Sequence, residues 1–214
     1  MVNIKICGIT NERDAIYSAE FGADYLGFLV EIPSSVDTIS REEAKRIIRK
    51  IPLEVIPVLV TYLDKADNII ELAEFVKPAV IQLHKEIEIG EIGLIRKALP
   101  KVKITYTIHV ENDDDIKNMR DVERYVDYIL LDTIANGRIG GTGKTHDWNI
   151  SRRIVRQCKK PVFLAGGLNP ENVIEAIAKV KPFGVDVNTG VKSKPRVKDY
   201  NKLRQFIERA KMMG

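Results

Sequence analysis

The most constraining feature of this sequence is a regular alternation of short hydrophobic runs with longer amphipathic segments. The runs are rich in Val, Ile and Leu, and eight of them occur, at residues 2–7, 23–30, 53–60, 79–84, 101–108, 126–132, 160–165 and 183–188. Several are almost continuously hydrophobic, as strands buried on both faces require. The segments between them have the spacing of amphipathic helices. Such alternation predicts parallel strands joined by helices.

Eight strand–helix units in 214 residues predict a closed (β/α)8 barrel, the TIM barrel, as one domain over residues 1–214. An open doubly wound sheet is the structural rival. That fold usually carries G-x-G-x-x-G after its first strand, whereas residues 7–11 read C-G-I-T-N. No linker or low-complexity run divides the chain.

Signals for helix ends support these units. Gly22 is expected to stop the first helix, and Ser40 with Glu43 forms a capping-box pattern before the second. Asn169 is expected to cap a later helix, with Pro170 in its first position.

Composition limits the classes of partner and the location that we expect for this chain. The 34 Lys and Arg residues barely exceed the 30 Asp and Glu, and no basic block is interleaved with aromatic residues, so we expect no nucleic-acid partner. The N-terminal apolar run is too short for a signal peptide, and no stretch approaches the roughly 18 apolar residues of a membrane span. Two cysteines, Cys7 and Cys158, make no disulfide framework, so a cytoplasmic location is expected.

In a barrel, catalytic residues lie at the carboxyl ends of the strands. Cys7 and Asp132 end the first and sixth predicted strands. A thiol there can be a general base or nucleophile, and a buried carboxyl group can be a general acid. The alternatives are a cysteine that packs as a small hydrophobic residue and an aspartate that caps a helix. Two groups with opposite proton duties suit an isomerisation.

Glycine-rich loops follow the last three strands: G-G-T-G at 140–143, A-G-G-L-N at 165–169 and N-T-G at 188–190. The first continues into G-K-T, but Arg138 occupies the position where a P-loop has its opening glycine. The backbone N–H groups of such loops also bind phosphate groups in proteins that do not hydrolyse nucleotides. We therefore expect a phosphate site here; ordinary strand-to-helix turns are the alternative.

Histidines give no metal signal. His84, His109 and His146 lie in different units, without the close spacing or evident carboxylate companion of a zinc site. No bound metal is expected.

The motifs together resemble a known family, the phosphoribosylanthranilate isomerases of tryptophan biosynthesis. The resemblance runs from the first strand to the last helix and rests on K-I-C-G-I-T (5–10), G-A-D-Y-L-G-F (22–28), Q-L-H (82–84), L-L-D-T (130–133), G-G-T-G (140–143) with D-W (147–148), L-A-G-G-L-N-P-E-N-V (164–173) and D-V-N-T-G-V (186–191) with K-D (198–199). It implies a (β/α)8 fold and an Amadori rearrangement of a phosphorylated aminoaldose, without metal or cofactor. Family members occur as monomers and dimers, so either state is expected.

The resemblance also implies roles for individual residues. Cys7 would be the general base that removes the C2′ proton, and Asp132 the general acid that protonates the ring oxygen. The substrate phosphate would be held by loop residues, namely Gly141, Thr142, Gly143, Gly166, Gly167, Asn188, Thr189 and Gly190.

One family feature is missing. The family usually has S-P-R after the second strand, where the arginine helps to hold the substrate carboxylate; here Val36 or Asp37 takes its place. Arg41 and Arg138 are the candidate replacements. Three further departures look peripheral to the proton chemistry: Lys192 for the usual glutamate, Arg196 for a glycine and Lys85 for the glycine after Q-L-H.

The missing arginine leaves two alternatives open beside the tryptophan-pathway isomerase. One is a related isomerase acting on a phosphorylated aminosugar or aldose without a carboxylate. The other is a phosphate-binding barrel without catalytic activity, against which the presence of Cys7 and Asp132 argues.

Overall fold

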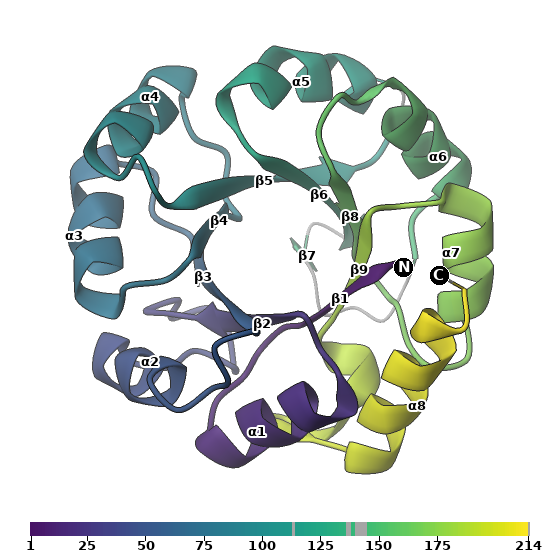
Figure 1. The fold of residues 1–214 in the computed structure, drawn as a ribbon. Helices are drawn as coiled ribbons and strands as arrows, with labels where there is room; N and C mark the ends of the chain where they lie inside the picture. The colour runs from purple at the N-terminus through teal and green to yellow at the C-terminus, as the bar shows by residue number, and fades with distance from the viewer. Residues whose placement is uncertain (113, 136–137, 140–144, 214) are drawn as a thin grey trace.

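The chain folds into a closed ring of parallel strands surrounded by helices (Figure 1). In this computed structural model the described residues are 1–112, 114–135, 138–139 and 145–213. The strands of the ring are β1 (Asn3–Ile6), β2 (Tyr25–Leu29), β3 (Ile56–Thr61), β4 (Val80–Leu83), β5 (Lys103–Val110), β6 (Tyr128–Ala135), β8 (Val162–Leu164) and β9 (Gly184–Val187). Each pairs with the next in parallel, and β9 closes the ring by pairing with β1. The predicted (β/α)8 barrel is confirmed.

The helices form the outer layer of the molecule (Figure 1). They are α1 (Glu12–Phe21), α2 (Arg41–Ile48), α3 (Ala66–Val76), α4 (Ile89–Ala98), α5 (Asp115–Val122), α6 (Trp148–Gln157), α7 (Val173–Val180) and α8 (Tyr200–Lys211). Most neighbouring helices touch, and α1 touches α8, so the last unit packs against the first.

Short elements decorate the barrel. β7 (Arg138–Ile139) pairs antiparallel with the end of β6, and β10 (Lys192–Lys194) pairs antiparallel with β11 (Val197–Lys198). The short helices η1 (Glu123–Tyr125) and η2 (Thr189–Val191) precede β6 and follow β9. The β10–β11 hairpin was not predicted, because two- and three-residue strands are too short to carry a hydrophobic period.

Side chains alternate between the two faces of each strand, as barrel closure requires. Tyr25, Val58, Leu130 and Phe163 point inward and line one small internal cavity. Leu26, Leu59, Ile129 and Leu164 belong instead to the larger hydrophobic cluster shared with the helices. These two clusters explain why the strands read as hydrophobic runs.

A polar layer lies within the barrel above that apolar interior. The Lys5 ammonium donates to Gln82 Oε1 at 2.7 Å and to Asp186 Oδ2 at 2.8 Å, and all three residues are buried. A buried charge is tolerated when it is paired and hydrogen-bonded. Burial alone would lower the pKa of Lys5, but the negative charge of Asp186 and the neighbouring Cys7 raise it above its usual value, so Lys5 is a cation inside the barrel.

Most predicted helix ends are confirmed, and one is wrong. Gly22 ends α1 in the left-handed conformation, and Ser40 with Glu43 forms the capping box of α2. However, α7 begins at Val173 rather than at Pro170. The side chain of Asn169 accepts from the N–H groups of Glu171 and Asn172, which holds the residues before α7 in a turn.

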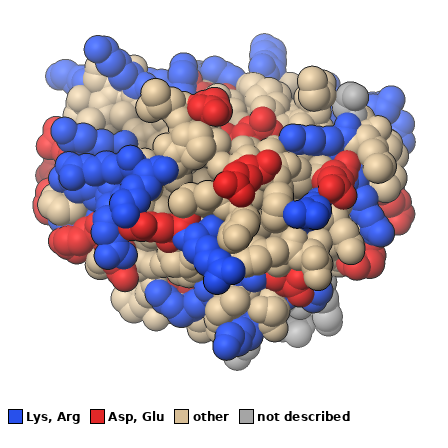
Figure 2. All heavy atoms as spheres, turned by 60° about the horizontal axis from the view of Figure 1, so that its bottom comes forward, with Lys and Arg blue, Asp and Glu red and all other residues tan. Residues whose placement is uncertain are grey.

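The surface carries charges of both signs. On the face that lies toward the lower edge of Figure 1, Lys and Arg side chains are interspersed with Asp and Glu (Figure 2). Within the part of the chain that the structure describes, no helix combines the length and apolar character needed to cross a bilayer.

Candidate active site

Cys7 directly follows β1 at the carboxyl end of the barrel. Its side chain is buried, and Gly27 on β2 makes room for it: a Cβ atom added at Gly27 would lie 2.7 Å from the Cys7 sulfur. Burial raises the pKa of the Cys7 thiol to about 11, against the opposing effect of the Lys5 charge. The thiol is therefore protonated at neutral pH in the free protein.

Asp132 lies on β6 and is also buried. Its Oδ1 accepts a hydrogen bond of 2.7 Å from the N–H of Thr133, which favours the carboxylate form. Burial outweighs that hydrogen bond and raises the pKa of Asp132 to about 6. An aspartate with that pKa holds a proton in an appreciable fraction of molecules near neutrality, as a general acid must.

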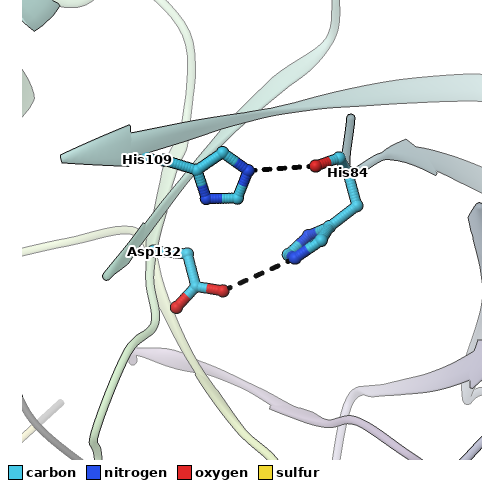
Figure 3. Close-up of side chains that lie close together, drawn as sticks. All are labelled: His84, His109 and Asp132. Carbon is cyan, nitrogen blue, oxygen red and sulfur yellow. Dashed lines mark hydrogen bonds and ion pairs between the residues drawn. The ribbon is translucent and has the colours of Figure 1, made fainter. Parts of the chain in front are cut away.

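Two histidines lie beside Asp132 (Figure 3). His84, which follows β4, places Nε2 3.7 Å from Asp132 Oδ2. His109, on β5, directs Nε2 to the carbonyl oxygen of His84 at 3.0 Å. Burial lowers the pKa of His84 to about 3, so His84 is neutral at pH 7 and its contact with Asp132 is not an ion pair. The inference that the histidines lie apart is wrong for this pair, because neighbouring strands bring their ends together.

The cluster of His84, His109 and Asp132 has the residue types of a metal site, and one atom from each lies within 4.8 Å of the others. The hydrogen bonds around His84 do not suit a metal. Gln82 Nε2 lies 3.1 Å from His84 Nδ1, while Gln82 Oε1 is held by Lys5. The amide therefore donates to Nδ1, and the proton of the neutral ring resides on Nε2, where a metal would need a lone pair.

The last two predicted phosphate loops, at 165–169 and 188–190, lie next to each other. Gly166 and Gly167 adopt positive φ angles of 81° and 67°, which glycine alone adopts readily. Gly190 is so close to the preceding loop that an added Cβ would lie 2.0 Å from the Leu168 carbonyl oxygen. Thr189 and Gly190 form η2. Gly141, Thr142 and Gly143 lie outside the described residues.

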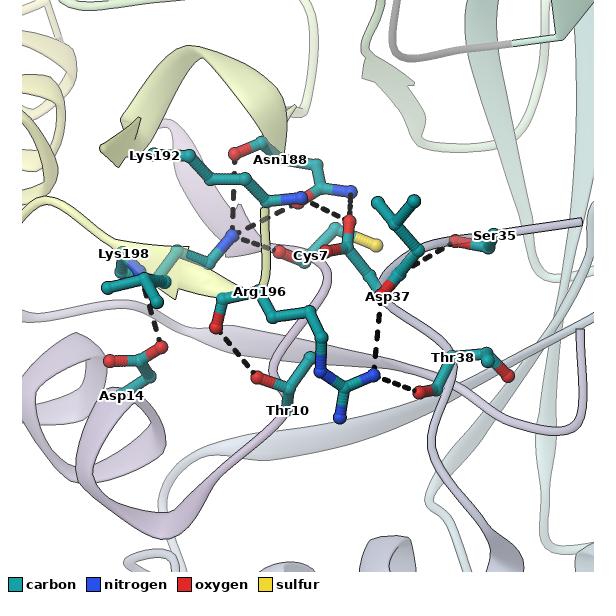
Figure 4. Close-up of polar contacts among 12 residues, drawn as sticks. Cys7, Thr10, Asp14, Ser35, Asp37, Thr38, Asn188, Lys192, Arg196 and Lys198 are labelled. Atoms are coloured by element: carbon teal, nitrogen blue, oxygen red, sulfur yellow. Dashed lines mark hydrogen bonds and ion pairs between the residues drawn. The ribbon is translucent and has the colours of Figure 1, made fainter. Parts of the chain in front are cut away.

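Asn188 lies between these loops and a charged network, which is shown in Figure 4. Its amide nitrogen donates to Asp37 Oδ2 at 2.9 Å, and its Oδ1 accepts from Lys198 Nζ at 3.1 Å. Gly8 allows this approach, because a Cβ at Gly8 would lie 2.3 Å from Asn188 Oδ1. The side chain of Asn188 is thus committed to the network.

Asp37 is the buried centre of this network. Its carboxylate pairs with Lys192, and this pair and the hydrogen bond from Asn188 lower its pKa despite burial. The other carboxylate oxygen of Asp37 is buried without a partner among the described residues. Val36, by contrast, is exposed and touches the network only through its carbonyl oxygen, which accepts from Arg196 at 3.3 Å.

Lys198 joins the network to the candidate base. Its ammonium group is buried and donates to the Cys7 carbonyl oxygen at 2.5 Å. Burial lowers the pKa of Lys198 to about 8. The residue therefore remains mostly cationic at pH 7 and adds positive charge beside Cys7.

Two of the departures, Lys192 and Arg196, place their side chains on the segment around Asp37. Arg196 donates to the Thr38 carbonyl oxygen at 2.7 Å. Arg41, suggested as a replacement cation, pairs with Glu31 and Glu71 instead, and the side chain of Arg138 lies outside the described residues. The sequence carried one signal for the pair of Asp37 and Lys192. Where the family usually has an arginine and a glutamate, this chain has an aspartate and a lysine, so the two charges are exchanged.

Comparison with known proteins identifies the same family that the sequence motifs resemble, and the match extends over nearly the whole chain. Residues 4–209 match the family described as N-(5'phosphoribosyl)anthranilate (PRA) isomerase. N-(5'-phosphoribosyl)anthranilate isomerase 2 of Methanosarcina mazei is 42% identical over 213 residues, which cover 98% of this chain and 94% of that protein.

Two solved structures agree in fold. One is of monomers generated from the dimeric phosphoribosylanthranilate isomerase of Thermotoga maritima (TM-score 0.85, 39% identity, 99% of this chain and 100% of that one). The other is a phosphoribosylanthranilate isomerase in complex with reduced 1-(o-carboxyphenylamino)-1-deoxyribulose 5-phosphate (TM-score 0.84, 37% identity, the same coverage). With its motifs, its barrel and its sequence all matched from first unit to last, the chain belongs to the N-(5'-phosphoribosyl)anthranilate isomerase family.

Proposed function

We propose that this chain catalyses the Amadori rearrangement of N-(5-phosphoribosyl)anthranilate to 1-(2-carboxyphenylamino)-1-deoxyribulose 5-phosphate in tryptophan biosynthesis. The observation that carries the proposal is that a buried thiol, Cys7, directly follows β1 and a buried carboxyl group, Asp132, lies in the C-terminal half of β6. The reaction moves protons within one molecule, so an acid and a base are the chemistry it requires.

Asp132 begins the reaction as the acid. It gives a proton to the furanose ring oxygen while the anthranilate nitrogen pushes electrons toward C1′, which opens the ring to an iminium ion. The pKa of about 6 supports this role, because the group holds a proton near neutral pH and releases it readily.

Cys7 completes the reaction as the base. Its thiolate removes the proton from C2′ of the iminium ion, and the resulting enolamine tautomerises to the aminoketose. Because burial raises the pKa of Cys7 to about 11 and that of Asp132 to about 6, the state with thiolate and protonated acid is a small minority of free molecules at neutral pH. Substrate binding that stabilises the thiolate therefore has a large effect on rate.

The phosphate would be bound by backbone N–H groups of the adjacent loops containing Gly166, Gly167, Thr189 and Gly190, together with the loop of Gly141, Thr142 and Gly143. The positive φ angles of Gly166 and Gly167 support this role, because turns of that kind direct successive N–H groups toward one anion.

Lys192 is the cation that we propose for the substrate carboxylate. An ammonium group has three N–H donors, and Asp37 uses one of them. Lys192, Lys198 and Arg196 together bring more positive charge to this side of the barrel than Asp37 neutralises. Asp37 thus positions a cation and does not repel the carboxylate, which favours the tryptophan-pathway substrate over one without a carboxylate.

Turnover of freshly generated phosphoribosylanthranilate, followed by the loss of its fluorescence, is the direct test of this function. We expect multiple turnovers by the wild-type chain without added metal or cofactor. Absence of turnover, together with isomerisation of a phosphorylated aminosugar that lacks the carboxylate, would contradict the proposed substrate. Absence of both activities would favour a binding role.

The role of Lys192 predicts a specific pattern of KM values. Replacing Lys192 alone would leave Asp37 charged, buried and unpaired, so the informative comparison is Asp37→Asn against Asp37→Asn with Lys192→Met. We expect the single variant to keep KM within about threefold and the double variant to raise it about 10- to 100-fold, the effect of losing one charge-assisted hydrogen bond. Lys194→Met, on the same hairpin but exposed, is the control. Equal KM values for the single and double variants would exclude Lys192 from carboxylate binding.

A further inference from the structure

The two histidines beside Asp132 are held in fixed orientations by hydrogen bonds on the ring nitrogens that face away from it. For His84 the chain of contacts starts at Lys5. Lys5 can only donate, so Gln82 Oε1 must face it, and the amide N–H groups of Gln82 point to the His84 Nδ1 at 3.1 Å and the Thr107 hydroxyl oxygen at 3.3 Å. The neutral His84 ring therefore carries its proton on Nε2.

His109 is oriented by a partner of the opposite kind. Its Nε2 lies 3.0 Å from the carbonyl oxygen of His84, which can only accept, so Nε2 carries the proton when the ring is neutral. The other nitrogen, Nδ1, is buried and has no partner among the described residues. Figure 3 shows this nitrogen on the side of the ring that faces Asp132.

Asp132 is thus flanked by one N–H donor and one lone pair. We propose that His84 and His109 are positioning residues with opposite hydrogen-bonding polarity, which give Asp132 a partner in both of its protonation states. The carboxylate accepts from His84 Nε2–H, whose 3.7 Å separation from Oδ2 shortens when the charge forms. The protonated acid donates its O–H to His109 Nδ1.

The proposal has a consequence for catalysis, which rests on the proposed function, in which Asp132 is the acid. The two histidines contact Asp132 at different stages of its proton transfer. Before the reaction, His109 Nδ1 orients the acidic proton. As that proton leaves for the ring oxygen, negative charge develops on Asp132 and the His84 N–H stabilises it. Such a contact is stronger in the transition state than before it, so it raises kcat more than it changes KM.

The orientation of each ring can be measured without any substrate. The chain has three histidines, so ¹⁵N-histidine labelling with long-range ¹H–¹⁵N correlation gives three ring patterns, which single His→Gln variants assign. We expect His84 to be neutral near pH 7 with its proton on Nε2, and the neutral form of His109 to carry its proton on Nε2 as well. A proton on Nδ1 of either ring, or a charged His84, would overturn the proposal.

Gln82→Glu tests the link through Gln82. A glutamate accepts from Lys5 and can no longer donate to His84, so His84 has to place a proton on Nδ1. We expect the NMR pattern of His84 to change and kcat to fall about 10- to 100-fold, while KM changes less than about threefold. Thr107→Val is the control, because it removes the other acceptor of the Gln82 amide and leaves the bond to His84 intact.

The outcomes separate this proposal from the proposed function. An unchanged His84 pattern in Gln82→Glu, or a changed pattern with wild-type kcat, would overturn the proposed role of the tautomer. Failure of the proposed function would instead be a wild-type chain without turnover, whatever the orientation of its histidines.

Discussion

Replacing Cys7 with alanine is expected to lower kcat by about 10² to 10⁴, the usual contribution of a positioned acid–base group. The proton on C2′ is bound to carbon and leaves only when a base removes it. Cys7 is buried against Gly27, and the methyl group of alanine leaves no base at that position. The effect is measured by steady-state fluorescence turnover at several substrate concentrations, and we expect KM to change little.

Cys158→Ala is the matched control for this variant. Burial raises the pKa of the Cys158 thiol to about 11 as well, but Cys158 lies after α6, away from the carboxyl ends of the strands. It should retain wild-type kcat. A Cys7→Ala variant that keeps more than a tenth of wild-type kcat, with an unchanged thermal unfolding midpoint, would show that another group is the base.

Asp132→Asn is expected to produce a comparable loss and to change the pH profile as well. In the wild type, kcat/KM should rise with pH up to about 6, since the thiolate becomes commoner while Asp132 stays protonated. Above that value the gain in thiolate is cancelled by the loss of protonated acid, so the profile becomes flat. Without the acid, only ionisation of Cys7 remains, and the residual kcat/KM should keep rising toward its pKa of about 11.

The profile of the variant therefore identifies the acid independently of the size of the rate loss. Asp127→Asn is the control, because Asp127 precedes β6 and binds Arg96 at the opposite end of the strand. It should keep the wild-type profile and lose stability only. A flat profile between pH 6 and 9 in Asp132→Asn would mean that Asp132 is not the group that titrates.

The parts of the fold that could be predicted are those set by local sequence patterns. Hydrophobic runs, helical spacing and cap residues such as Ser40 are set by neighbours in sequence, and each predicted strand lies within a few residues of the observed one. The start of α7 was wrong for the same reason. Asn169 and Pro170 match a helix start locally, but the side chain of Asn169 forms a turn with Glu171 and Asn172, and α7 begins only at Val173.

The sequence predicts candidate site residues one at a time, but it does not show which of them contact one another. Cys7 and Asp132 were predicted from their places at strand ends. Asp37 and Lys192 are 155 positions apart, and a missing arginine gave no reason to look for its substitute on the last unit of the barrel. The contact of His84 with His109 does not follow from their separation of 25 residues in sequence, but the predicted barrel contained the signal, because it places the ends of consecutive strands such as β4 and β5 side by side.

The contact between Lys198 and the carbonyl oxygen of Cys7 has a consequence for synthesis of the protein. The two residues are 191 positions apart, so the candidate base leaves the ribosome well before the lysine that binds its carbonyl oxygen. Translation at roughly 5–20 residues per second separates these events by about ten seconds or more. A nascent chain in which seven of the eight strand–helix units have been synthesised still lacks the hydrogen bond from Lys198 to the Cys7 carbonyl oxygen. Truncated products of interrupted translation should accordingly be inert, and the enzyme should gain activity in one late step when the last helix docks.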